Sequence, residues 1–206
     1  MIVAEAPAPP PPARPADLLF VFAGAEHRKR FAIEAWRGGA ARTLVVSVAR
    51  FEWRRVPGLG LPGDGGLVAV VKSVPPPKRL FQLIVTGDSV EARAVTKGAG
   101  GTWHEAVALA ALARERRATS LLVCTSDYHL PRALLSVRRA LARTEGPPCA
   151  VTGLAAPIPA DSPLAPGKRW RSPEAWFALA LEGVKYAAYA VGVPSWFDGA
   201  ADRGPP

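Results

Sequence analysis

Apolar residues in this chain fall into short runs separated by amphipathic stretches. The runs at 18–22, 43–48 and 121–124 are largely apolar, which is typical of parallel strands buried on both faces. The stretches at 26–37 and from 102 to about 117 predict helices. This alternation of strands and helices predicts a Rossmann-like three-layer α/β/α domain with a mainly parallel sheet.

The second half of the chain continues the alternation. Residues 128–143 place their large apolar side chains on one helical stripe, and 149–152 predict a short last strand. Ser172-Pro173 combines a capping serine with a proline in the first turn, which predicts a final helix that runs to about 191.

Between residues 52 and 100 the pattern changes. Glycines and prolines crowd the first part of this segment. Farther on, the mostly apolar residues 81–85 and the alternating residues 90–95 flank Thr86-Gly87-Asp88-Ser89. Two such runs around a short turn predict a β-hairpin. We interpret this segment as an insertion into the domain.

Proline density sets the predicted boundaries. The run at 6–15 favours extended polyproline II, so residues 1–16 are predicted to be a disordered leader. Residues 17–193 are predicted to form one domain, followed by a C-terminal tail at 194–206. A chain of 206 residues that is 49% hydrophobic suits one domain with a real core.

Composition narrows the function classes. No run of 18 apolar residues and no signal peptide is seen, so we expect a cytoplasmic protein without a transmembrane segment. Two cysteines make no disulfide framework or zinc site. The net charge of +9 favours anionic partners. The arginines are scattered, which makes nucleic acid an unlikely partner and leaves peripheral membrane contact open.

Ligands of parallel α/β sheets bind beyond the carboxyl ends of the strands, where helices begin. The strand at 121–124 is followed closely by Ser126 and Asp127, which open a helix. His129 and Arg132 are three residues apart and share a helix face. An imidazole beside a fixed cation suits acid–base chemistry with an anion clamp. In the alternative interpretation Asp127 caps the helix.

Two further segments have the same placement. Gly101 and Thr102 begin the helix that carries Glu105, where glycine would let a ligand approach the backbone and Glu105 could act as a base. The Thr-x-x-Glu spacing is also a capping box, which is the structural alternative. Gly24 follows the first strand, with Arg30 one turn into its helix. No recognised metal-ligand spacing occurs, so no metal is predicted.

Together these segments resemble the YdcF-like, SanA- and ElyC-like family, a bacterial domain of unknown function. The matching residues are Gly24, Arg30, Gly39, Ser47, Thr102, Glu105, Ala106, Thr125, Ser126, His129, Arg132, Ala133, Glu182, Lys185 and Tyr186. The resemblance implies a Rossmann-like fold. It also implies a link to the cell envelope and points to S-adenosylmethionine as a ligand. The cofactor itself is left open, with S-adenosylmethionine and a nucleotide as the two candidates.

The residues and the resemblance lead to one functional expectation. We expect an enzyme, a hydrolase or transferase, that acts on a phosphorylated or other anionic small molecule. His129 and Glu105 are the expected catalytic residues. The expected ligand-binding residues are Gly24, Arg30, Ser47, Gly101, Thr102, Ser126, Asp127 and Arg132. The alternative is a non-catalytic nucleotide or S-adenosylmethionine binding module.

Overall fold

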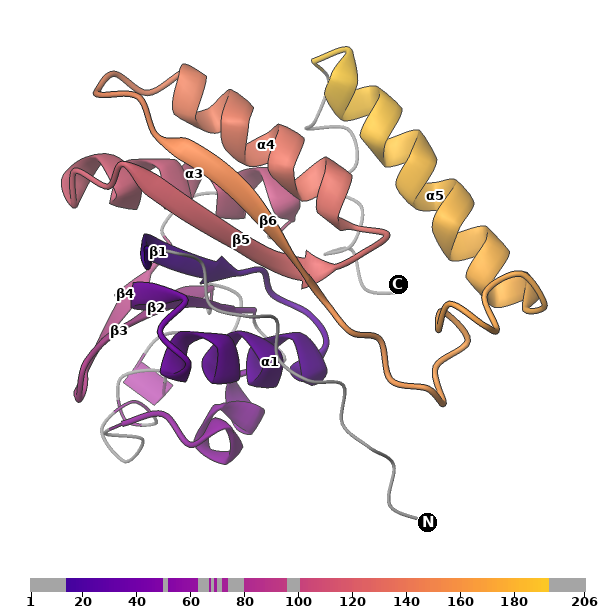
Figure 1. Ribbon diagram of the computed structural model, residues 1–206, viewed down its shortest axis with the longest axis horizontal. Coiled ribbons are helices and arrows are strands. Elements are labelled where there is room, and N and C mark those ends of the chain that lie inside the picture. Colours follow the sequence, from indigo (N-terminus) through magenta and orange to yellow (C-terminus); the bar gives the residue numbers. More distant parts are fainter. Residues whose placement is uncertain are drawn as a thin grey trace.

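A central six-stranded sheet organises the protein (Figure 1). The computed structural model describes residues 14–49, 52–62, 67, 69, 72–73, 80–95 and 101–192. The strands are β1 (Ala16–Val21), β2 (Ala41–Val48), β3 (Phe81–Thr86), β4 (Ser89–Ala94), β5 (Ser120–Ser126) and β6 (Ala150–Ala156). The helices are α1 (Glu26–Arg37), the 3-10 helix η1 (Trp53–Leu59), α3 (Thr102–Glu115), α4 (Leu130–Ala142) and α5 (Pro173–Ala190).

The strand order is β4-β3-β2-β1-β5-β6. Strands β2, β1, β5 and β6 run parallel to one another. β3 and β4 form a hairpin that pairs antiparallel with β2. The predicted α/β fold with a mainly parallel sheet is therefore confirmed. The predicted hairpin is also present. It extends the main sheet, because β3 pairs directly with β2.

Helices cover both faces of the sheet (Figure 1). α1 packs on the face that carries Leu19 and Val21 of β1. α3 and α4 pack on the opposite face, which carries Leu18 and Phe20. Successive side chains of a strand point to opposite faces. A strand covered on both sides is therefore apolar at every position, as the continuous run in the sequence indicates.

Most predicted boundaries agree with the structure to within a few residues. β1 begins at Ala16, so the last residue of the predicted leader belongs to the sheet. The rest of that prediction, over residues 1–13, lies outside the described residues, as does the predicted tail at 194–206. Most of the glycine- and proline-rich stretch from 63 to 79 also lies outside them.

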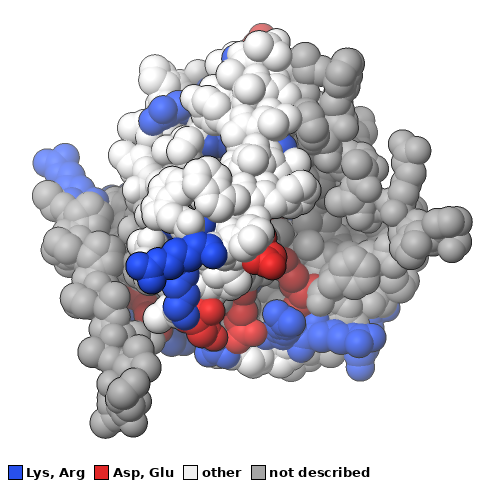
Figure 2. Space-filling view, turned by 90° about the vertical axis from the view of Figure 1, so that its right-hand side faces the viewer, with Lys and Arg blue, Asp and Glu red and all other residues white. Residues whose placement is uncertain are grey.

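α5 packs against α4 and presents an apolar outer side. Ser172 caps the helix as predicted, since its hydroxyl accepts a hydrogen bond from the Ala175 N–H at 3.3 Å. Figure 2 views this side of the molecule, and the surface over α5 is mostly free of charged residues. Trp176, Phe177 and Val184 are exposed there. Within the described residues, no helix has the length and apolar character needed to cross a bilayer.

Candidate functional site

Hydrogen bonds from α1 and α3 hold the turn after β1 in place. The Ala23 N–H donates to Glu105 Oε1 at 2.8 Å, and Lys29 Nζ donates to the Gly24 carbonyl at 3.2 Å. Gly24 has φ +124°, a conformation that other residues rarely adopt. A Cβ at this position would overlap the guanidinium of Arg28. Glycine is therefore required so that Arg28 can lie against the backbone of the turn.

Arg28 is a buried cation that makes no ion pair with any of the described residues. It is 9% exposed, and its Nη1 donates to Thr125 Oγ1 at 2.8 Å. Its Nε is buried without a hydrogen-bond partner, and no carboxylate among the described residues pairs with it. A buried, unpaired charge is strongly unfavourable. The position in the first turn of α1 adds to this, because a helix N-terminus favours anions.

His129 lies in a chain of hydrogen bonds between two arginines. Its Nδ1 lies 2.8 Å from Thr125 Oγ1, and its Nε2 lies 3.2 Å from Thr102 Oγ1. Arg28 donates to the first hydroxyl and Arg132 to the second, the latter at 2.7 Å. Burial lowers the pKa of His129 well below its ordinary value, and the charges of Arg132 and Arg28 lower it further. The imidazole is therefore neutral, with one nitrogen donating and the other accepting.

Glu105 is a buried carboxyl group on the other side of this turn. Its Oε1 accepts hydrogen bonds from the Ser47 hydroxyl and from the Ala23 N–H. Burial raises the pKa of Glu105, and the nearby charge of Glu52 raises it further. The capping-box interpretation is wrong. Thr102 is the first residue of α3 and makes no cap bond, because its hydroxyl bonds to His129 and Arg132.

Arg132 is paired with a carboxylate from α5. Its Nε and Nη2 donate to the two carboxylate oxygens of Glu182 at 2.8 and 2.9 Å. The residue is only 7% exposed, so Arg132 is buried although it lies in the first turn of α4. Glu182 therefore compensates the charge of Arg132, whereas no carboxylate of the described residues compensates that of Arg28.

Arg30 lies apart from this cluster. It is largely exposed and bonds to Glu26 at 2.8 Å and to the Gly58 carbonyl at 3.2 Å. Arg28 and Arg30 are two residues apart, which places them on roughly opposite sides of a helix. Arg28 therefore occupies the place that the sequence analysis assigned to Arg30. The run Arg28-Lys29-Arg30 was the available signal, but it does not show which side faces the sheet.

Three remaining predicted residues surround the cluster. Ser126 ends β5, and its hydroxyl is buried without a partner among the described residues. Asp127 accepts from the Tyr128 N–H at 2.7 Å and pairs with Arg169 at 2.6 Å. His129 is the residue that precedes α4, so the interpretation of Asp127 as its cap is wrong. Gly101 is exposed, has φ +101° and immediately precedes α3.

The structure therefore brings Gly24, Ser47, Thr102, Glu105, His129 and Arg132 to one edge of the sheet. Comparisons with protein-family models, with curated proteins and with solved structures found no match for this chain. Within the described residues, no three His, Cys, Asp or Glu side chains gather closely enough to hold a metal ion. The roles of the clustered residues stay predictions.

The neutral His129 predicts a specific pH dependence of stability. Its folded-state pKa is depressed, so below pH 6.5 the unfolded state binds a proton that the folded state does not. Its contribution to stability is present above pH 6.5 and is lost as the pH falls toward the folded-state pKa. The slope is about 1.4 kcal/mol per pH unit.

Denaturant unfolding of the wild type and His129→Gln at several pH values between 7.5 and 5.5 measures this effect. We expect the free energy of unfolding of the wild type to fall more steeply with acidification. The same slope in both proteins would show that His129 is protonated equally in the folded and unfolded states.

Proposed function

We propose that this protein binds a phosphorylated or other anionic small molecule between the carboxyl ends of β1 and β5, and acts on it as an enzyme. The observation that carries the proposal is the buried guanidinium of Arg28, which no carboxylate of the described residues neutralises. An anionic ligand would supply the missing charge. Charge-assisted hydrogen bonds of this kind are among the strongest that proteins form.

The place in the fold supports the same conclusion. β1 pairs with β2 on one side and with β5 on the other, and the connecting helices α1 and α3 lie on opposite faces of the sheet. Ligands of open α/β sheets bind where the chain diverges in this way. The N-terminus of α1 follows the Gly24 turn directly, and a helix N-terminus attracts anions.

Glu105 supplies the proposed acid–base group. Burial raises the pKa of Glu105, which makes its carboxylate a stronger base than an exposed one and suits it to accepting a proton. In the described part of the chain both of its hydrogen bonds converge on Oε1. We propose that Glu105 accepts a proton from the Ser47 hydroxyl or from a bound water, while Arg28 holds the negative charge of the substrate. This chemistry suits a hydrolase or a transferase.

A nucleotide or S-adenosylmethionine binding module without turnover is the second candidate. It is favoured by His129, because both ring nitrogens already bond to threonine hydroxyls. In the enzyme, His129 would then act through Thr102 or Thr125. The link to cell-envelope metabolism rests on the resemblance to the YdcF-like family alone. We also propose a cytoplasmic location and peripheral membrane contact.

Arg28→Gln is expected to weaken the binding of an anionic probe by about ten- to a hundredfold, since charged hydrogen bonds contribute about 1.5–3 kcal/mol. The probes are inorganic phosphate, AMP and a sugar phosphate, first in a thermal-shift screen and then by calorimetric titration. S-Adenosylmethionine is included to detect the second candidate.

Arg30→Gln is the matched control, because it removes the same charge from the same helix outside the cluster. We expect it to leave probe affinity nearly unchanged. Equal losses in both variants would indicate a general effect of net charge and would contradict a site at Arg28. A wild type that binds none of the anionic probes would likewise contradict a site at Arg28.

A further inference from the structure

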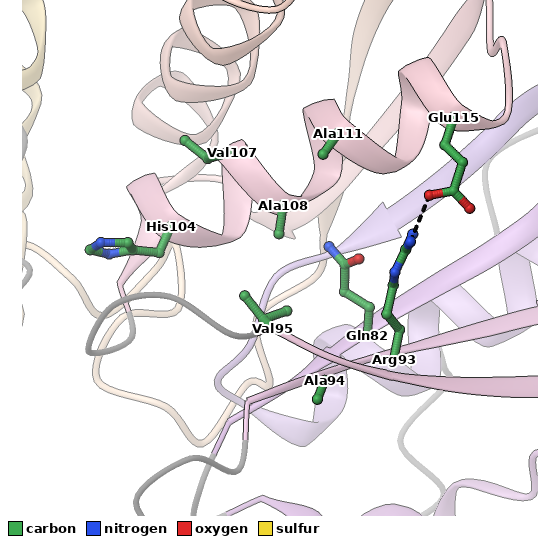
Figure 3. Close-up of a pocket in the computed structure, with 9 residues that line it drawn as sticks. All are labelled: Gln82, Arg93, Ala94, Val95, His104, Val107, Ala108, Ala111 and Glu115. Atoms are coloured by element: carbon green, nitrogen blue, oxygen red, sulfur yellow. Dashed lines mark ion pairs between the residues drawn. The ribbon is translucent and has the colours of Figure 1, made fainter.

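A pocket lies between the β3–β4 hairpin and α3 (Figure 3). Its volume is about 310 Å³. Its walls are mostly small and apolar, formed by Ala94, Val95, Val107, Ala108 and Ala111. An ion pair between Arg93 and Glu115, 2.6 Å long, closes one end, and His104 lies at the other.

Gln82 is the polar group inside this pocket. It shares a face of β3 with Ile84, beneath α3, where the neighbouring strands contribute Phe20 and Val45 to the core. It is 2% exposed, and its Nε2 is buried with no hydrogen-bond partner among the described residues. Figure 3 shows its amide standing between the sheet and α3, with the nitrogen toward Ala108. A buried amide without a partner destabilises the fold unless something else binds it.

The strand register places this amide beside the candidate site. Gln82 lies opposite Ser47 of β2 on one side and opposite Arg93 of β4 on the other. Residues directly opposite each other in a sheet have neighbouring side chains on the same face. Ser47 donates to Glu105 of α3, so the pocket begins one strand away from that pair.

We propose that this pocket binds a neutral, planar group with an amide edge, such as a lactam ring or a nucleobase. The Gln82 amide presents one donor and one acceptor side by side, whichever way it is rotated. An edge that carries a carbonyl next to an N–H satisfies both, as glutamine does when it pairs with adenine in DNA. The apolar side chains of Ala94, Val107, Ala108 and Ala111 suit contact with the faces of such a ring. This inference does not depend on the anion site at Arg28.

The test uses 2-pyridone as the probe and toluene as a ring of similar size without hydrogen-bonding groups. Binding is followed by NMR, through the side-chain amide signals of the intact, ¹⁵N-labelled protein. We expect 2-pyridone to shift the Gln82 signals. Gln82→Met keeps the length of the side chain but removes the amide. We expect it to lower the affinity for 2-pyridone at least tenfold and to leave toluene binding intact.

Two further variants complete the test. Ala108→Leu fills the pocket from α3 and keeps Gln82, so both probes should fail to bind. Arg28→Gln should leave 2-pyridone binding unchanged, which separates this site from the anion site. The inference is overturned if 2-pyridone does not bind the wild type or binds Gln82→Met equally well. It is also overturned if Ala108→Leu retains binding.

Discussion

Replacing Arg132 by alanine is expected to lower the free energy of unfolding by about 3–5 kcal/mol, the usual effect of removing one partner of a buried ion pair. Glu182 would lose both donors of the guanidinium and would be left with the Lys185 ammonium, 4.0 Å from its Oε1. Arg132 also donates to Thr102 and lies over the ring of Tyr189, 5.4 Å from its centroid. The substitution therefore loosens the contact between α4 and α5 as well as the His129 chain.

Arg138→Ala is the matched control for this experiment. Arg138 belongs to the same helix, and its single described bond is an exposed one to the Val151 carbonyl at 3.2 Å. Its removal should change stability by no more than about 0.5 kcal/mol. Urea unfolding of the three proteins measures both effects. A loss below about 1 kcal/mol for Arg132→Ala would match an exposed ion pair and would leave Arg132 available as a ligand clamp.

Replacing Gly24 by alanine is expected to lower the free energy of unfolding by about 1–3 kcal/mol, because the left-handed backbone strains any residue with a Cβ. The substitution should also weaken the binding of anionic probes by the same factor as Arg28→Gln. The new Cβ would overlap Nη2 of Arg28, so the guanidinium that bonds to Thr125 through Nη1 would have to shift. Denaturant unfolding and calorimetric titration measure the two effects separately.

Gly39→Ala isolates the backbone part of that prediction. Gly39 has φ +85°, and nothing lies within 4 Å of where its Cβ would stand. We expect a similar loss of stability with unchanged probe affinity. If Gly24→Ala also left affinity unchanged, the close approach of Arg28 to the turn would have no part in binding.

The elements of this fold were readable from the sequence because they depend on local patterns. The run at 18–22 is apolar at every position, and such a run is stable only between two covered faces. Ser172-Pro173 marked the start of α5 through a capping bond that spans three residues. The turn at Gly87 marked the hairpin. Each of these signals lies within a few residues of the structure it specifies.

The position of the candidate site was predicted for a similar reason. Strand ends followed by helix starts must meet at one edge of a parallel sheet, which is why Gly24, Glu105 and His129 could be grouped in advance. Ser47 was added to this group through the resemblance to the YdcF-like family. The sequence did not indicate which residues these side chains bond to. Ser47 and Glu105 are 58 residues apart, and Arg132 and Glu182 are 50 residues apart.

Only the tertiary structure decided which basic residue of α1 faces the sheet. The sequence carries Arg28, Lys29 and Arg30 in succession, and helical periodicity separates them without indicating the inward side. The orientation follows from the packing of Ala32 and Ile33 against the strands, which turns Arg28 inward and Arg30 outward. Likewise Thr102 and Glu105 have the spacing of a capping box. Each bonds elsewhere because buried partners from distant strands and helices lie within its reach.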